Sequence, residues 1–170
     1  MPRRDRSSAQ LSTDLPGYVL PSDFDLDAFL AQPLMAHLAT ASEAGPRDSP
    51  VWFLWEDGAI WLVGNTRDTF PKRIERDARC AVGIVQFDLA RGLLRHVGIR
   101  GVGAVERLDH DRLKRLLRRY LGDDETAWNR DFNASVIDRL ELMIRIQPTS
   151  ILARDQSYFS NVSPRGAGRT

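Results

Sequence analysis

Four residues between positions 66 and 73 have the chemistry that holds an anionic group. Thr66, Thr69, Lys72 and Arg73 supply two hydroxyls and two cations at the start of a segment that the sequence predicts to be a short helix. The amides that begin a helix add a positive dipole, and all of these groups bind phosphate well. The alternative for Lys72 is an ordinary solvated surface lysine. The residue types therefore suit a phosphate, and on residue types alone both this interpretation and the solvated surface stay open.

Sequence motifs for other common chemistries are missing. The chain has no phosphate-loop signature and no Gly-x-Gly-x-x-Gly that opens a helix, and it lacks the Gly-x-Ser-x-Gly elbow of hydrolases. His37, His96 and His110 are far apart and lack metal-ligand spacing with acidic residues. These absences disfavour hydrolases and metalloenzymes, and no catalytic or metal-ligating residue is assigned.

Composition narrows the class of protein further. The chain has 170 residues, of which 42% are apolar and 28% charged, as expected for one globular domain. Its 24 basic and 23 acidic residues nearly balance, so we expect no general attraction to nucleic acid or membranes. The single cysteine, Cys80, excludes a disulfide scaffold. No apolar run reaches the length of a membrane span, and the polar start lacks a signal peptide, which predicts a cytoplasmic protein.

The elements that must position these residues follow from periodicity and turn signals. Asp57-Gly58 is a strong hairpin signal, and Gly122 is typical of a helix end. We expect a domain over residues 21–155, with flexible tails at 1–20 and 156–170. The first expected helix follows an N-cap at Ser22 and stops near Pro33, and the others cover 69–77, 109–121 and 124–139. The expected strands cover 34–41, 49–55, 59–63, 78–87, 96–108 and a last pair, 140–147 and 150–154, broken at Pro148. This order predicts a mainly β protein of the α+β class, with about six antiparallel strands forming a barrel and helices outside it.

The order of several short motifs supports a more specific assignment. The motifs are Leu38-Ala39-Thr40, Gly45-Pro46-Arg47, Ser49-Pro50-Val51-Trp52-Phe53, Thr66, Lys72-Arg73-Ile74 and Asp77-Ala78-Arg79-Cys80-Ala81-Val82. Together they resemble the pyridoxamine 5'-phosphate oxidase-like, FMN-binding split-barrel proteins. The resemblance covers residues 29–108 well and the remainder only by the order of its elements. It implies a six-stranded antiparallel split β-barrel.

The resemblance also implies a cofactor and a set of residues that bind it. FMN is the implied cofactor, and its phosphate would contact Thr66, Thr69, Lys72 and Arg73. Arg47, Ser49, Pro50, Val51 and Trp52 correspond to the strand along the edge of the flavin ring, although alternation lets only one of two adjacent side chains face the ligand. His96 stands where relatives place a polar residue near the ring. The sequence departs from the family at Phe70 and Pro71, where relatives carry a serine and often an arginine.

What the resemblance implies for function is a flavin-dependent oxidoreductase. Hydride would pass between the bound flavin and a pyridine nucleotide or small organic substrate, in a homodimer whose two sites are each built from both chains. The C-terminal substrate motif of the vitamin B6 oxidase is not visible, so we do not expect that activity. One alternative is a deazaflavin (F-420)-dependent reductase of the same fold. Another is a non-enzymatic flavin or haem binder, for which His37, His96 and His110 are the available axial ligands.

Overall fold

The computed structural model describes residues 18–19 and 24–158. The expected tails at 1–20 and 156–170 lie outside the described residues, except for 18–19 and 156–158. At the carboxyl end of the described chain, the amides of Gln156 and Tyr158 still donate to the carbonyls of Leu94 and Gly92. The chain therefore remains attached to the sheet through Tyr158.

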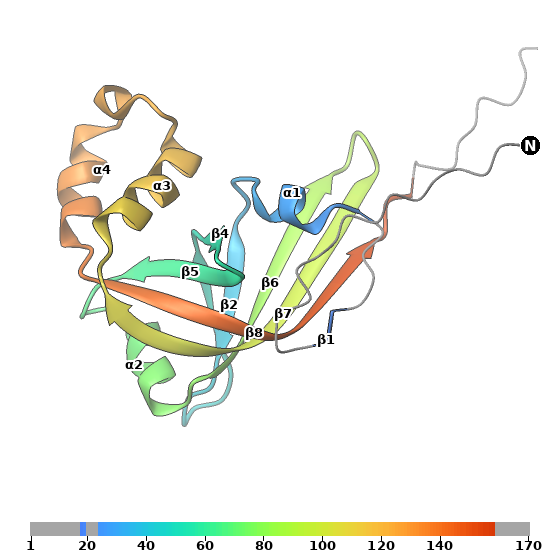
Figure 1. Cartoon of the computed structure of the whole chain (residues 1–170), viewed down its shortest axis with the longest axis horizontal. Helices are drawn as coiled ribbons and strands as arrows, with labels where there is room; N and C mark the ends of the chain where they lie inside the picture. The colour runs from blue at the N-terminus through green and yellow to red at the C-terminus, as the bar shows by residue number, and fades with distance from the viewer. Residues whose placement is uncertain (1–17, 20–23, 159–170) are drawn as a thin grey trace, which may run out of the picture.

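One curled, mainly antiparallel sheet forms the body of the protein (Figure 1). Its strands are β1 (Tyr18–Val19), β2 (Ala36–Thr40), β3 (Arg47–Val51), β4 (Leu54–Glu56), β5 (Ala59–Gly64), β6 (Arg79–Asp88), β7 (Leu93–Arg107) and β8 (Leu142–Asp155). They lie in the order β3-β2-β6-β7-β8-β5-β4, and β1 pairs with β8 in parallel. Because β3 and β4 stand at opposite ends of this order yet are joined by two residues, the sheet must curl back on itself. The predicted split barrel with flanking helices is confirmed.

The sheet has eight strands where the sequence predicted about six. One added strand is β1, and the other arises because the expected strand 49–55 is divided into β3 and β4 at Trp52 and Phe53. At this break Phe53 turns into the barrel and is fully buried, whereas Trp52 turns outward and stacks on Tyr120 with 4.6 Å between ring centroids. Two neighbouring aromatic residues thus enter two different cores, and strand alternation cannot continue through them.

The expected break at Pro148 is wrong, because β8 is continuous from Leu142 to Asp155. Ser150 pairs with Arg100 and Pro148 pairs with Gly101, which leaves Thr149 as the extra residue of a β-bulge. A bulge accommodates proline because the ladder is locally interrupted and the missing N–H is not needed. At Gly101 an added Cβ would lie 2.6 Å from the carbonyl oxygen of Gln147, so only glycine fits beside the bulge.

Helices cover the ends and one flank of the barrel (Figure 1). They are α1 (Leu26–Leu30), α2 (Thr69–Arg76), α3 (His110–Leu121) and α4 (Arg130–Ser135), with 3-10 turns at Glu125–Ala127 and Ile137–Arg139. The single helix expected over 124–139 is therefore wrong. The side chains of Asp124 and Asn129 each accept a backbone N–H, from Thr126 and Phe132, and so start two separate short elements.

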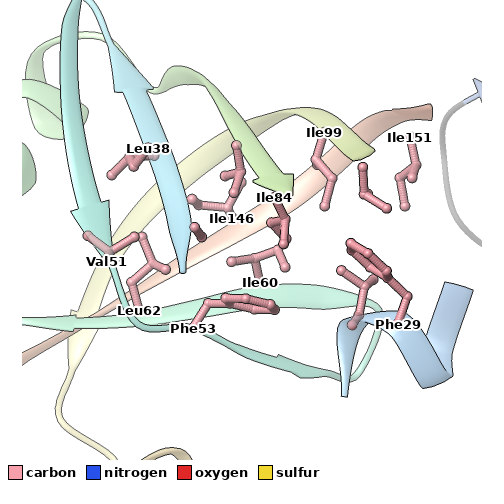
Figure 2. Close-up of a cluster of buried hydrophobic side chains, with 14 of the residues drawn as sticks. Phe29, Leu38, Val51, Phe53, Ile60, Leu62, Ile84, Ile99, Ile146 and Ile151 are labelled. Carbon is pink, nitrogen blue, oxygen red and sulfur yellow. The ribbon is translucent and has the colours of Figure 1, made fainter. Parts of the chain in front are cut away.

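The main core fills the barrel, where aliphatic side chains from six strands and α1 converge (Figure 2). Leu38, Ile60, Ile84 and Ile99 are almost completely buried there, and Phe29 of α1 closes the cluster from one end. A second core lies outside the barrel, where Leu113, Leu116 and Leu117 of α3 pack against Trp52. The outer core fixes the helical segment beside the break between β3 and β4.

Candidate phosphate- and ring-binding site

A buried arginine closes the end of the barrel beneath α2. The guanidinium of Arg73 donates to the Oγ1 atoms of Thr40 and Thr69, both at 2.7 Å, and to Ser49 Oγ at 3.1 Å. The helix is seated by Ile74, whose methyl groups fill the space over Gly103, where a Cβ would be only 2.9 Å away. The missing side chain at Gly103 therefore lets α2 approach the sheet and direct Arg73 inward.

The charge of Arg73 has no acidic counterpart among the residues that the structure describes. All three of its hydrogen-bond acceptors are hydroxyls, and no salt bridge to it is formed there. Burial lowers the pKa of the Arg73 guanidinium, and the nearby charge of Arg47 lowers it further. A buried cation without an anion is costly, so this end of the barrel is electrostatically prepared for an anionic ligand.

Two further cations belong to the same end of the barrel. Arg47 begins β3 opposite Thr40, and its side chain is exposed. Lys72 lies on the exposed face of α2 and forms no hydrogen bond or ion pair with the described chain. Phe70, at the family's serine position, turns toward Gly64 instead, and Pro71 is buried in the first turn of the helix. Arg47, Lys72 and Arg73 thus bring three positive charges to one end of the barrel.

A groove of about 740 Å³, lined by both apolar and polar side chains, adjoins this cluster. Four of the residues expected to bind the cofactor line it, namely Pro50, Val51, Trp52 and Thr66. Opposite them stand residues of α3, α4 and the following turn, including Leu117, Phe132, Val136 and Leu140. Arg47, Lys72 and Arg73 do not line the groove themselves, but they belong to β3 and α2, which also contribute Pro50, Val51 and Phe70 to its wall.

The expected donors at the start of α2 are already engaged by other groups. Thr66 donates from its amide and its hydroxyl to Glu141 Oε2, at 3.0 and 2.7 Å. The amide of Asn65 donates to Asp68 Oδ2 at 2.9 Å, and Asp68 itself stands at the N-cap of α2. Glu141 and Asp68 were not identified from the sequence, and Glu141 lies 75 residues from Thr66 with no local pattern to indicate the contact.

His96 lies on the other side of the sheet from the barrel interior. Its ring packs over Gly98, with Cε1 at 3.2 Å from where a Cβ would be, and its neighbours Val97 and Ile99 point into the core. Within a single chain it is therefore separated from the groove-lining side of β3. The other two histidines also stand apart, since His37 bonds Asp48 at 3.0 Å and His110 begins α3. Among residues 18–19 and 24–158, no three metal-ligating side chains gather.

The outer face of the sheet around His96 is smooth and partly apolar. Small residues from four strands form a shallow hollow of about 420 Å³, among them Ala39, Ala81, Gly83, Gly98 and Ser150. Val85 and Phe87 continue this face with exposed fractions of 47% and 59%. Contiguous exposed apolar surface of this kind is typical of protein interfaces. Within the described residues no helix is long and apolar enough to cross a membrane.

Comparisons with known proteins give one family model and several structures of the same fold. The sequence profile of the pyridoxamine 5'-phosphate oxidase family matches residues 24–154. No curated protein matches the chain. A conserved hypothetical protein from Mycobacterium tuberculosis superposes with a TM-score of 0.62 at 21% identity, over 84% of this chain and 90% of that one. An F-420 reductase superposes with a TM-score of 0.60 at 20% sequence identity, over 78% of this chain and 98% of that one. A flavocytochrome from Azotobacter vinelandii superposes with a TM-score of 0.59 at 13% sequence identity, over 78% of this chain and 66% of that one. At these identities the structures show a shared fold.

Proposed function

Because the chain belongs to the pyridoxamine 5'-phosphate oxidase family, we propose that it binds FMN and transfers hydride between the flavin and a pyridine nucleotide or small organic substrate. The observation that carries this proposal is the charge of Arg73, which no acid of the described residues compensates, close to the groove. A ligand with a phosphate at one end and a flat ring at the other would satisfy both features.

The residues present fit such a ligand. Guanidinium and ammonium groups are the strongest phosphate partners in proteins, and Arg47 and Lys72 are free to provide them. The positive charge of Arg73 would attract the phosphate without contacting it, because the N–H groups of Arg73 keep their hydrogen bonds to the three hydroxyls. The groove has the size of ordinary small-molecule sites, and its wall combines apolar side chains with polar and charged ones.

The chain's own residues would orient the ring and exclude water from it. Pro50 and Val51 place the end of β3 along the groove, and Trp52 forms its wall. Trp52 is held by its stack with Tyr120, and the two ring planes are 2° from parallel. This wall of the groove is therefore rigid before any ligand binds. The flavin would supply the hydride chemistry itself, which is consistent with the lack of an assigned protein acid or base.

Deazaflavin F-420 is the second candidate for the cofactor. Arg67 and Arg139 line the groove, and neither guanidinium forms a hydrogen bond or ion pair with the described residues. A ligand with a longer acidic tail would find partners there. The likeness to an F-420 reductase favours the same candidate. A colourless protein that takes up neither FMN nor deazaflavin would also exclude a non-enzymatic flavin binder and leave a protein that binds another ligand, such as haem.

We also propose that a second copy of the chain covers the outer face of the sheet. Small side chains at Ala81 and Gly83 allow close approach, and Val85 and Phe87 supply apolar area. In such a dimer His96 would approach a flavin site only across the interface. Light scattering should give twice the chain mass of 19.2 kDa for the wild type and the single mass for Ala81→Arg. Equal masses for both proteins would contradict this arrangement.

The first experiment is the absorbance spectrum of freshly purified protein, followed by heat release and chromatography of any chromophore. Released FMN or deazaflavin identifies the cofactor, and failure to take up either from solution overturns the proposal. Lys72→Ala should weaken FMN at least about tenfold while leaving riboflavin, which lacks the phosphate, unchanged. Lys114→Ala is the matched control, because Lys114 is the only other lysine and pairs with Glu125 on α3.

A further inference from the structure

The carboxylate of Glu141 occupies a pair of donors that the resemblance assigns to a phosphate. Its Oε2 accepts both the amide and the hydroxyl of Thr66, at 3.0 and 2.7 Å. An amide and a hydroxyl converging on one oxygen are a typical way of binding a phosphate oxygen. The carboxylate is thus an internal anion in the position of an external one.

The neighbouring donors of the segment are satisfied from within it. The amide of Asn65 bonds to Asp68, and the amides of Arg67 and Asp68 bond to Asn65 Oδ1 at 2.8 and 3.2 Å. Across residues 65–68, Thr66 is the residue whose amide and hydroxyl are engaged by an acid from elsewhere in the chain. An entering anion could gain the Thr66 donors without disrupting the turn itself.

The Glu141 side chain can leave without disturbing the fold. Its backbone amide donates to the carbonyl of Gly64 at 3.0 Å, which holds residue 141 at the end of β5. The side chain is exposed, and no guanidinium or ammonium group bonds to it in the described structure. The Thr66 donors, with a contribution from the charge of Arg67, hold the pKa of Glu141 below its ordinary value, so the carboxylate is charged at neutral pH.

We propose that Glu141 is a specificity-determining residue that competes with the phosphate of the cofactor for Thr66. The empty protein keeps its donors satisfied through Glu141, and loading a phosphorylated flavin displaces the carboxylate into solvent. The residue therefore weakens the binding of ligands with a phosphate at this position relative to ligands without one. This inference rests on the proposed function for the identity of its ligand.

The test compares Glu141→Ala and Glu141→Gln with Glu75→Gln, a matched control. Glu75 lies exposed on α2, so its substitution removes one negative charge near the site without touching Thr66. Dissociation constants for FMN and riboflavin are measured by flavin fluorescence. Glu141→Ala should bind FMN about tenfold more tightly than the wild type, with riboflavin unchanged and with less than about a twofold effect in the control.

An unchanged or weaker affinity of Glu141→Ala for FMN would overturn the inference, since Glu141 would then merely hold the loop in shape. A second measurement does not depend on a flavin. Hydrogen exchange at Thr66 should be faster in Glu141→Ala, and inorganic phosphate should slow that exchange and raise the melting temperature more than in the wild type. If no variant binds FMN or deazaflavin, the proposed function fails, and the effect of inorganic phosphate then tests the role of Glu141 without a flavin. Equal effects of phosphate on the wild type and Glu141→Ala would then refute the role of Glu141.

Discussion

Replacing Arg73 by methionine tests the buried end of the barrel. Methionine fills a similar unbranched volume but donates no hydrogen bonds, so the hydroxyls of Thr40, Thr69 and Ser49 lose their shared partner. Ser49 and Thr69 are partly or fully open to solvent, and water can replace the lost donor. Thr40 is only 3% exposed, and its hydroxyl would be left without a partner. The cost is therefore concentrated on one buried oxygen.

The expected loss of stability follows from this one buried hydroxyl without a partner. An orphaned buried hydroxyl costs about 1–3 kcal/mol, and each lost bond from a charged donor adds to it. The desolvation of the guanidinium, which methionine removes, offsets part of this. We expect Arg73→Met to lower the free energy of unfolding by about 2 kcal/mol, or the melting temperature by about 5 °C. Adding Thr40→Val to Arg73→Met removes the unpartnered hydroxyl, and it should restore about 1 kcal/mol of the free energy of unfolding.

Urea unfolding followed by circular dichroism, in a buffer without phosphate, measures these differences. Arg76→Met is the control, because Arg76 lies on the same helix with a side chain that is 78% exposed and 3.9 Å from Glu43. That variant should stay within about 0.5 kcal/mol of the wild type. Equal stabilities for Arg73→Met and Arg76→Met would refute the reasoning, because Arg73 would then contribute nothing to the apo fold.

Three further predictions concern other parts of the molecule. Tyr120→Phe keeps the stack on Trp52 but removes the hydroxyl that accepts the Phe53 amide at 3.1 Å, and should cost about 1–2 kcal/mol in urea unfolding; a neutral result would contradict this. The hydrogen bond from Arg115 holds the pKa of Glu56 below its ordinary 4.5, so this carboxylate stabilises the fold above that pH and the benefit is lost as pH falls through the lowered value. Glu56→Gln should therefore be less stable than the wild type by about 1 kcal/mol at neutral pH and equal to it in strong acid, whereas a constant difference would refute the linkage. Partial burial raises the pKa of Cys80 to about 11, so a thiol reagent at neutral pH should label the native protein far more slowly than the unfolded chain, and equally rapid labelling of both would contradict this.

Local patterns were sufficient for most of the architecture. Asp57 and Gly58 both adopt the positive φ that a tight hairpin requires, so the turn between β4 and β5 followed from two residues. The α3 helix begins after its Asp109 cap and ends at Gly122, as its apolar spacing and caps predict. The elements that failed were decided by contacts between distant residues. The break at Trp52 is fixed by a stack on Tyr120, which no local propensity anticipates.

The sequence by itself determined that this chain forms an antiparallel barrel with its cations and hydroxyls near β3 and α2, because strand alternation, turn residues and helix caps act over a few neighbouring positions. It also determined the family, because the motifs keep their order along the chain. Tertiary structure alone decided that Arg73 is buried with no acid of the described residues beside it, and that His96 lies on the outer face. It also decided that Glu141 reaches Thr66 across 75 residues. Burial and pairing of charges depend on which distant segments the sheet brings together, and only the complete fold specifies that.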